Sequence, residues 1–222
     1  MPTQLKARKT PRRPTKAKTP IVAFYSVYND MELLPKSVES IEPYVDQMIF
    51  LDGIYARFPG TTPISTDNLR SFAYSFGPKG KYYIASGYEQ HEKRNLAFRL
   101  APPGSWILVI DGDEVLHGAR HLRQAIRGLT EDIGSILFSE NGNYYTRIFR
   151  ARPGVGYVNH SHIGHDGRIT SICNCLGERL PEQIYFHNLK EERSTDRKAQ
   201  KAIYYEGKSR TEVEMIQRLR LG

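Results

Sequence analysis

The stretch Trp106-Ile-Leu-Val-Ile-Asp111-Gly-Asp113-Glu114 joins a short apolar run to an acidic turn. The apolar run follows Pro102-Pro103-Gly104 and predicts a central strand of a covered sheet. Ligands bind just beyond the carboxyl ends of such strands. Mg²⁺ or Mn²⁺ prefers oxygen ligands and leaves positions for the phosphate oxygens of a substrate. The two aspartates could hold such a cation, but they also suit a plain acidic turn in which Asp111 caps a helix.

A helical stretch, Glu92–Ala101, leads into this strand, with apolar residues at helical spacing. The order of Lys93-Arg94-Asn95, the apolar helix face and the strand with its Asp-x-Asp turn resembles the centre of family 2 glycosyltransferases. This resemblance implies an α/β fold: a single GT-A domain (nucleotide-diphospho-sugar transferase, Rossmann-like). Its sheet would be mixed, mostly parallel and flanked by helices.

The amino-terminal half agrees with that resemblance. Ile21–Asn29 predicts a first strand, Asp30–Ile41 a helix that tolerates Pro35 near its start, and Val45–Gly53 a second strand. Strands that alternate with helices predict a parallel sheet with a nucleotide crevice at its carboxyl edge. Ser65-Thr66-Asp67 resembles the Ser-Thr-Asp turn of the family.

The segments after the acidic turn continue the pattern. His117–Leu129 predicts a helix, Gly134–Phe138 a short strand, and Tyr144–Arg150 a further segment. Its residues Arg147-Ile-Phe-Arg150 resemble the Arg-x-Phe-Arg motif of the same glycosyltransferases. Arginines there could face donor phosphates or an acceptor, or could form surface salt bridges.

The resemblance also implies a metal shell. Asp113 would bind the cation directly, and Asp111 would contact it through water or hold the ribose of the donor. His187 follows an apolar run and precedes a basic segment, as a histidine does near the carboxyl end of many GT-A domains. Its imidazole could complete the shell of Mn²⁺. A half-buried structural histidine is the alternative for His187.

The donor site is implied in the same way. The first strand would form one wall of the nucleotide pocket, and residues after the second strand and on the helix would hold the nucleobase and phosphate. The residues expected to bind the donor are Tyr25, Val27, Asn29, Asp52, Arg94 and Asp111.

The acceptor side is less defined by the sequence. The histidine-rich stretch Asn159–Asp166 invites a zinc site, but its spacing matches no common zinc pattern. It matches better the loop that lines the acceptor in the resembling family. Contacts to the acceptor or to phosphate are expected from Arg147, Arg150, His160 and His162. The base that deprotonates the acceptor stays open among Asp166, Glu178 and Glu182.

Charge is concentrated at the amino terminus. The chain has 222 residues and a net charge of +8, and its first twenty residues contain seven lysines and arginines without one acid. We therefore divide the chain into a disordered basic arm, residues 1–20, and a GT-A domain, residues 21–222. The arm could attract nucleic acid by counterion release. A solubilising extension is an equal alternative, and an anionic membrane surface a weaker one.

The expected location is the cytoplasm. No apolar run approaches the ~20 residues that span a bilayer, and the amino terminus lacks the apolar core of a signal peptide. The sequence carries no signal for an oligomeric state.

The sequence therefore predicts a metal-dependent glycosyltransferase that uses Mn²⁺ or Mg²⁺ and a nucleotide sugar, with a UDP-sugar favoured. The acceptor would be a hydroxyl group, on a hydroxylated base in DNA or on a protein or glycan. A nucleotidyltransferase could use the same carboxylates, but it needs a third acid and a phosphate-gripping loop. A non-catalytic nucleic-acid-binding module on the same fold is the other alternative.

Overall fold

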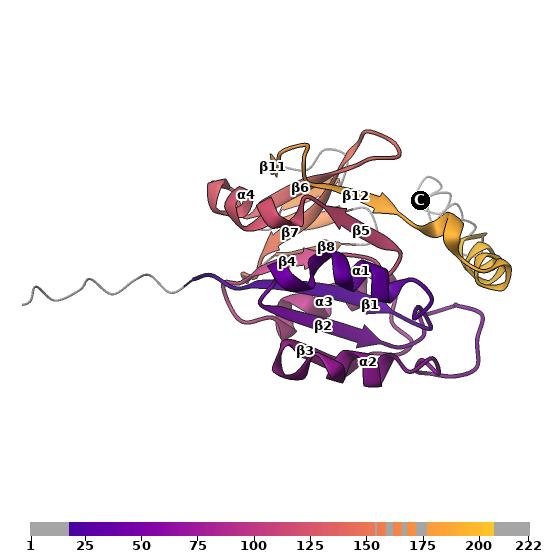
Figure 1. Ribbon diagram of the computed structural model, residues 1–222. Helices are drawn as coiled ribbons and strands as arrows, with labels where there is room; N and C mark the ends of the chain where they lie inside the picture. The colour runs from indigo at the N-terminus through magenta and orange to yellow at the C-terminus, as the bar shows by residue number, and fades with distance from the viewer. Residues whose placement is uncertain (1–17, 154, 159–161, 166–167, 172–176, 207–222) are drawn as a thin grey trace, which may run out of the picture.

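A mostly parallel sheet forms the centre of the protein (Figure 1). The computed structural model describes residues 18–153, 155–158, 162–165, 168–171 and 177–206. In these residues nine strands form one sheet in the order β3-β2-β1-β4-β7-β6-β12-β5, with β11 also paired to β6. The strands are β1 (Ile21–Val27), β2 (Gln47–Asp52), β3 (Gly80–Ile84), β4 (Trp106–Val109), β5 (Glu114–His117), β6 (Ile133–Phe138), β7 (Tyr144–Arg150), β11 (Glu178–Arg179) and β12 (Tyr185–Asn188).

Strand direction confirms the predicted fold class, an α/β fold with a mixed, mostly parallel sheet flanked by helices. The block β3-β2-β1-β4 is parallel throughout. β7 runs antiparallel to β4 and β6, and β5 runs antiparallel to β12. A separate antiparallel sheet joins β8 (Gly156–Val158), β9 (His162–His165) and β10 (Arg168–Ser171).

Helices cover both faces of the large sheet. They are α1 (Leu34–Ile41), α2 (Leu69–Ser75), α3 (Gln90–Leu100) and α4 (Leu122–Gly128), together with helical residues 195–206 and the short 3₁₀ turns η1 (Glu42–Tyr44), η2 (Gly77–Lys79), η3 (Ala119–His121) and η5 (Lys190–Glu192). Buried residues of α1, α2 and α4 pack in one core cluster and those of α3 in another. Because both faces are covered, β1 is buried along its whole length.

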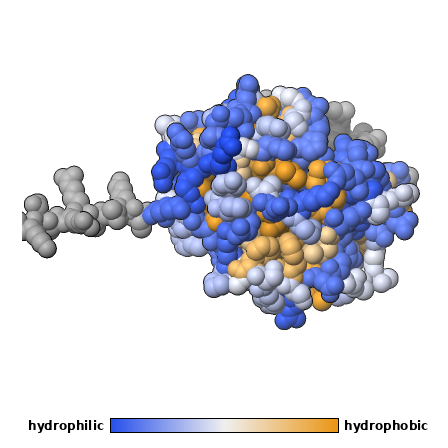
Figure 2. Space-filling model, viewed as in Figure 1, coloured by the Kyte–Doolittle hydropathy of each residue, from blue (hydrophilic) through white to orange (hydrophobic). Residues whose placement is uncertain are grey.

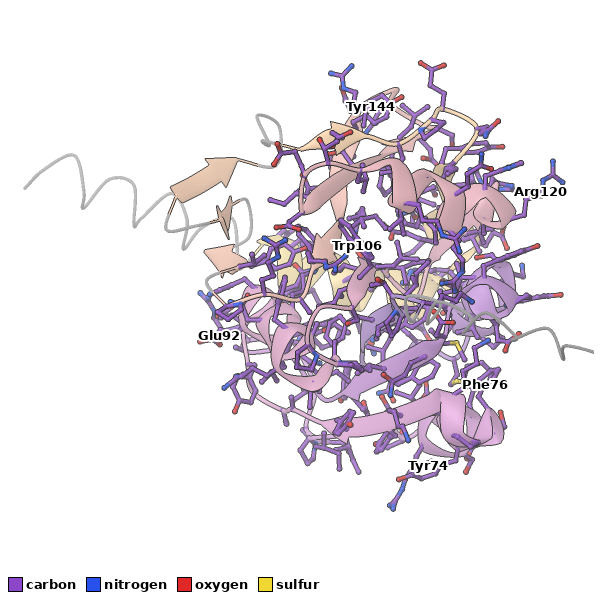
Figure 3. All side chains as sticks on the ribbon, turned by 90° about the vertical axis from the view of Figure 1, so that its left-hand side faces the viewer. Tyr74, Phe76, Glu92, Trp106, Arg120 and Tyr144 are labelled. Atoms are coloured by element: carbon purple, nitrogen blue, oxygen red, sulfur yellow. The ribbon has the colours of Figure 1, made fainter. Side chains whose placement is uncertain are left out.

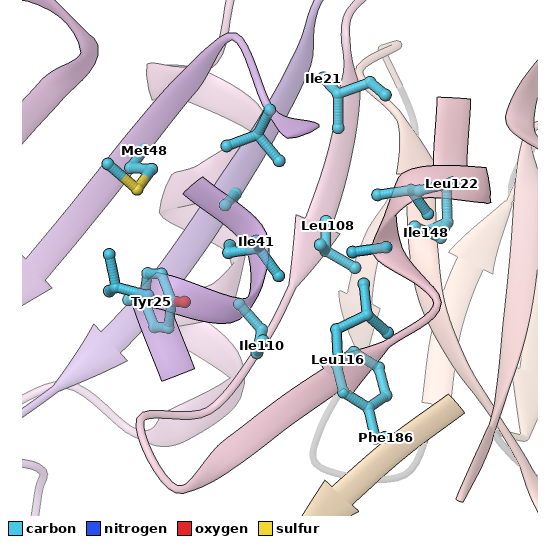
Figure 4. Packing of buried hydrophobic residues seen from close by; sticks show 14 of the residues in the cluster. Ile21, Tyr25, Ile41, Met48, Leu108, Ile110, Leu116, Leu122, Ile148 and Phe186 are labelled. Atoms are coloured by element: carbon cyan, nitrogen blue, oxygen red, sulfur yellow. The ribbon is translucent and has the colours of Figure 1, made fainter. Parts of the chain in front are cut away.

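Side chains of β1 alternate between the two clusters. Ile21, Ala23 and Tyr25 belong to the first cluster, while Val22 and Phe24 belong to the second. This alternation is the two-residue period of a strand. Figure 4 shows Tyr25, Met48, Ile110 and Phe186 in the first cluster, where strands from both halves of the sheet share one apolar layer.

Two helices begin later than predicted. Residues 31–33 form a turn in which the Asp30 carbonyl accepts the amides of Leu33 and Leu34, so α1 starts at Leu34. The helix expected over His117–Leu129 begins at Leu122, because His117 is the last residue of β5, which pairs with β12, and Ala119–His121 form η3. Gly118, with φ +69°, turns the chain out of the strand. β5 and β12 are far apart in the sequence, so their pairing cannot be predicted from the residues around His117 alone.

Asp52, at the end of β2, anchors the loop that follows it. Its carboxylate accepts the Ser65 amide at 3.1 Å, the Ser65 hydroxyl at 2.6 Å and the Tyr82 hydroxyl at 2.7 Å. The Asn29 amide donates in turn to the Ser65 hydroxyl at 2.7 Å. The predicted Ser-Thr-Asp turn is thus tied to the ends of both β1 and β2.

The surface in Figure 2 mixes hydrophilic side chains with smaller hydrophobic areas. No helix in the described ranges is long and apolar enough to cross a membrane.

Asp52→Asn should destabilise the protein by about 1.5–3 kcal/mol, because a buried charged acceptor loses strength in three hydrogen bonds. The urea midpoint measures this loss. The exposed Asp196→Asn is the matched control and should shift the midpoint by no more than the experimental error. Equal midpoints for the two variants would contradict the anchoring role of Asp52.

Candidate active site

A cleft of about 370 Å³ opens at the carboxyl ends of β1 and β4. One wall carries Asp30, Asp111 and Asp113, which follow these two strands. The opposite wall comes from the segment after β12 and from helical residues 195–206, which lie beyond the arrowheads of β1 and β2 in Figure 1. Its cationic lining residues are Lys190, Arg193, Arg197, Lys198 and Lys201.

Arg193 ties the two walls together. Its Nη1 donates to Asp30 Oδ1 at 2.8 Å, and its Nε donates to Asp113 Oδ2 at 3.2 Å. The Lys201 ammonium lies 3.9 Å from Asp30 and 3.7 Å from Asp113. The side chain of Arg193 is 2% exposed. One buried guanidinium therefore neutralises an aspartate from each of the two central strands.

The basic wall keeps Asp30 ionised. Burial alone would raise the pKa of Asp30, but Lys201, Arg193 and Arg197 outweigh burial and lower that pKa to about 2. Arg197 also donates to the backbone carbonyl of Tyr28, and so joins the helix to the chain between β1 and Asp30.

A second group of charges surrounds Asp111. Arg94 Nη2 donates to Asp111 at 3.2 Å, and Arg147 Nη2 donates to Glu114 at 2.7 Å. Glu114 accepts the amide of Asp111 at 2.9 Å. Burial raises the pKa of Glu114, and the charge of Asp111 adds to this against the pull of Arg147. Burial opposes ionisation of Asp111 too, but Arg94 and Arg147 lower its pKa.

Several guanidinium nitrogens around the cleft are buried without a hydrogen-bond partner in the described residues. They are Arg94 Nε, Arg147 Nη1 and Arg197 Nε. Buried donors are normally satisfied, and an anion is the natural acceptor for arginine. Of these three arginines only Arg197 lines the cleft, so the wall that carries Arg197 can accept an anionic group.

Lys93 supports the floor of the cleft. Its ammonium donates to the Gly53 carbonyl at 2.6 Å and lies 4.1 Å from the centroid of the Tyr55 ring. Burial lowers the pKa of Lys93 to about 7, although Asp52 and Asp30 oppose this shift. The Tyr55 hydroxyl donates to the Ser26 carbonyl at 2.7 Å. Tyr55 and Ser26 both line the cleft.

Of the residues predicted to bind the donor, Asp111 lines the cleft. Arg94 does not line the cleft but donates a hydrogen bond to Asp111. Tyr25, Val27 and Asp52 are fully buried, and none of them lines the cleft. The Tyr25 ring stacks on Phe50 at 5.4 Å between centroids. Both faces of β1 are covered, so Tyr25 and Val27 point into the core, and Ser26 is the β1 residue that lines the cleft. The Asn29 side chain is engaged with the Thr66 amide at 2.8 Å.

The structure corrects the place of His187. Its Nδ1 lies 2.8 Å from Glu140, and its ring packs edge-on to His117. The neighbouring Asn188 lines the cleft instead. Successive side chains of a strand face opposite sides, so β12 directs Asn188 and not His187 to the carboxylates.

The two predicted arginines of β7 separate. Arg147 lies beside Asp111 and Glu114, but Arg150 pairs with Trp106 at the opposite end of β4. β7 is antiparallel to β4, so its last residue lies at the amino edge of the sheet. This corrects the expectation that Arg150 shares the site.

Two acids expected as the base also lie elsewhere. Glu178 accepts the amides and the hydroxyl of the Thr130–Glu131 turn, and Glu182 is exposed. Neither lines the cleft. Asp166 and His160 lie outside the described residues, and for His162 the description covers only its place in β9.

Sequence reasoning missed four residues of the site: Asp30, Arg193, Arg197 and Lys201. The three basic residues recur every fourth position, and the last two of them, Arg197 and Lys201, lie on one face of helical residues 195–206, while Arg193 precedes that helix in an extended conformation. This period was available in the sequence. Asp30 follows β1 as Asp111 follows β4, and only the neighbouring positions of the two parallel strands bring them to one cleft.

The carboxylates partly fit a divalent cation. Asp111 and Asp113 could offer oxygens beside those of a bound phosphate, a donor set typical of Mg²⁺. No group of three histidine, cysteine or acidic side chains in the described ranges could hold a metal. A cation here would therefore rest on two carboxylates, with its other ligands from the substrate and water.

Comparisons with known proteins find similarity among solved structures. No family model and no curated protein matches the chain. Solved structures with similarity include S. aureus TarS 1–349, at 15% identity over 54% of this chain and 36% of that one, with a TM-score of 0.40. The mannosyltransferase PcManGT from Pyrobaculum calidifontis, solved with GDP-Man and Mn²⁺, is 17% identical over 55% of this chain and 36% of its own, with a TM-score of 0.40.

A third solved structure is 4-diphosphocytidyl-2C-methyl-D-erythritol synthase, at 12% identity and a TM-score of 0.42. It covers 78% of this chain and 77% of that one. This chain thus spans about a third of the first two proteins.

Arg193→Gln should cost about 3–5 kcal/mol at neutral pH, because it leaves Asp30 and Asp113 buried with less neutralisation. Lys198→Gln, which removes a more exposed cation of the same wall, is the control and should cost less than about 1 kcal/mol. Chemical unfolding measures both values. Equal losses would contradict the bridging role of Arg193.

The parent protein should lose the contribution of Asp30 as pH falls from about 4 to about 2, because the folded pKa lies below the ordinary value of 3.8. Above that window the contribution is fully present. In Arg193→Gln the free energy of unfolding should change less between pH 4 and pH 2, because without Arg193 the folded-state pKa of Asp30 lies closer to its ordinary value. An unchanged acid limb would contradict the assignment.

Proposed function

We propose that the protein is a glycosyltransferase with a GT-A-type fold that transfers a sugar from a nucleotide-sugar donor to a hydroxyl acceptor. One observation carries the proposal: Asp111 and Asp113, at the end of β4, share a cleft with a wall of buried arginines. Carboxylates for a cation and arginines for phosphate are what a diphosphate leaving group needs. The cleft lies beyond the carboxyl ends of parallel strands, where α/β proteins bind nucleotides.

Asp113 and Asp111 would hold Mn²⁺ or Mg²⁺, and the bound cation would supply Lewis-acid stabilisation to the departing diphosphate. Arg197 and Lys201 would bind phosphate oxygens from the opposite wall. Arg193 would stay attached to Asp30 and keep that wall at a fixed distance from β4. Asp111, oriented by Arg94, is also placed to hold the ribose of the donor.

Aromatic residues of the cleft could receive the nucleobase in place of the buried Tyr25. Tyr55, Phe58, Tyr204 and Tyr205 all line the cleft. The Tyr204 ring lies 5.4 Å from Phe58 and 5.4 Å from Tyr205 between centroids. Such rings stack on any base and therefore do not select one nucleotide. A UDP-sugar is favoured as the donor because of the family resemblance alone.

The acceptor is proposed to be a hydroxyl group, on a hydroxylated base in DNA or on a protein or glycan, in the cytoplasm. Asp166 remains the candidate base, since Glu178 and Glu182 do not line the cleft. Glycosyl transfer to each acceptor class, followed by mass spectrometry of the product, separates these possibilities.

A nucleotidyltransferase is the second candidate, because Asp30 is a third acid in the same cleft, although it does not form a three-carboxylate metal group with Asp111 and Asp113. Asp30 is already neutralised by three cations, which favours the first candidate. Release of pyrophosphate from a nucleoside triphosphate, with no turnover of nucleotide sugars, would support the second candidate and overturn the first.

Asp113→Asn should lower metal-dependent hydrolysis of the nucleotide sugar at least about tenfold, because the amide is a poorer ligand for a hard cation. The fold should persist, since Asn can still accept from Arg193. Asp196→Asn is the exposed control and should leave turnover unchanged. A screen of nucleotide sugars with Mn²⁺ or Mg²⁺, read by nucleotide release, makes the measurement. Unchanged turnover in Asp113→Asn would contradict the assignment of Asp113 as a metal ligand.

A further inference from the structure

A second hollow lies at the amino edge of the sheet, opposite the cleft. This hollow, here the amino-edge groove, has a volume of about 450 Å³. Trp106, the first residue of β4, lines it, and Figure 3 shows Trp106 near the middle of this side of the protein. The lining residues are Lys18, Thr19, Ile21, Trp106, Arg123, Ile126, Arg127, Leu129 and Arg150.

The amino-edge groove is lined by cations and by no acid. Its four basic residues come from three parts of the fold: Lys18 before β1, Arg123 and Arg127 on α4, and Arg150 at the end of β7. Arg123 and Arg127 are four residues apart, so they lie on one face of the helix. The sheet and α4 thus gather charges that are far apart in the sequence.

Carboxylates neutralise only part of this charge. Asp46, beside the groove, lies 3.4 Å from Lys18 and 2.8 Å from Arg123. Within the described ranges, neither Arg127 nor Arg150 forms an ion pair. The Arg150 guanidinium rests 5.3 Å from the centroid of the Trp106 ring, which holds its charge at the groove. The described groove therefore keeps an excess of positive charge.

The sequence before the groove adds to that excess. Lys18 is the first described residue, and residues 1–17 contain Lys6, Arg8, Lys9, Arg12, Arg13 and Lys16 without an acid. The basic arm therefore joins the folded domain at the groove itself.

We propose that the amino-edge groove binds the phosphate backbone of a nucleic acid. Guanidinium groups match phosphate oxygens, and a run of cations that neutralises several phosphates gains affinity from released counterions. Of the apolar residues of the groove, Ile21, Trp106 and Ile126 are buried and Leu129 is half-buried, so the groove offers little apolar surface for insertion into a membrane. This surface lies apart from the cleft and does not rest on the proposed glycosyl transfer.

The test uses the full chain and a short fluorescent DNA duplex, with affinity measured by anisotropy over a range of salt. Arg127→Gln should reduce the slope of log affinity against log salt by about 0.9, and Arg127→Gln with Arg150→Gln by about 1.8. Arg127 is exposed, so the single variant should fold even if loss of the contact between Arg150 and Trp106 weakens the double variant.

The matched control is Arg70→Gln with Arg99→Gln, two exposed arginines outside the groove that remove the same charge. It should leave the salt slope within error of the parent. Deletion of residues 1–17 should lower the slope further but leave a remainder that depends on Arg127. A slope that falls equally in control and groove variants would overturn the proposal.

Two more outcomes would overturn it: no DNA affinity at low salt, or stronger binding to anionic vesicles or a sulfated polysaccharide than to DNA at equal charge. The groove variants should hydrolyse nucleotide sugars as the parent does, because the cleft is at the other edge of the sheet. Loss of hydrolysis in Asp113→Asn alone therefore tests the active site, and loss of salt-dependent binding alone tests the groove.

Discussion

The candidate site depends on the contacts that the buried guanidinium of Arg193 makes with Asp30 and Asp113. This guanidinium joins Asp30 after β1 to Asp113 after β4, and it brings the segment after β12 against the end of the parallel block. Two buried carboxylates are costly to keep ionised, and Arg193 offsets this cost together with Lys201 and Arg197. The same contact joins the two walls of the cleft, so Arg193 contributes both to stability and to the geometry of the site.

This arrangement balances two kinds of charge in one cleft. The carboxylates of Asp111 and Asp113 suit a cation, while Arg197 and Lys201 suit an anion. Without a ligand the two walls neutralise each other, which keeps buried charge tolerable. A metal-bound diphosphate brings both signs and can replace these contacts with equivalent ones. The apo contacts are thus consistent with the proposed donor site.

The two edges of the sheet divide the proposed functions. The carboxyl edge carries the cleft, and the amino edge carries the groove around Trp106 and Arg150. β7 links them, since Arg147 reaches Asp111 while Arg150 reaches Trp106. Because β7 is antiparallel to β4, one short motif supplies a cation to each edge. Substitutions at one edge can therefore alter the proposed sugar transfer or the proposed nucleic-acid binding without altering the other.

The sequence by itself determined the β1, β2 and β4 strands and the acidic turn, because apolar runs and turn residues are local signals. It also located Asp111 and Asp113 in a cleft. Only the tertiary structure decided that Tyr25 and Asp52 are buried, that Asn188 rather than His187 faces the cleft, and that Asp30 joins it. These outcomes depend on strand pairing and on which face each neighbour covers. Contacts between residues more than 150 positions apart, such as Asp30 and Arg193, leave no pattern in either segment alone.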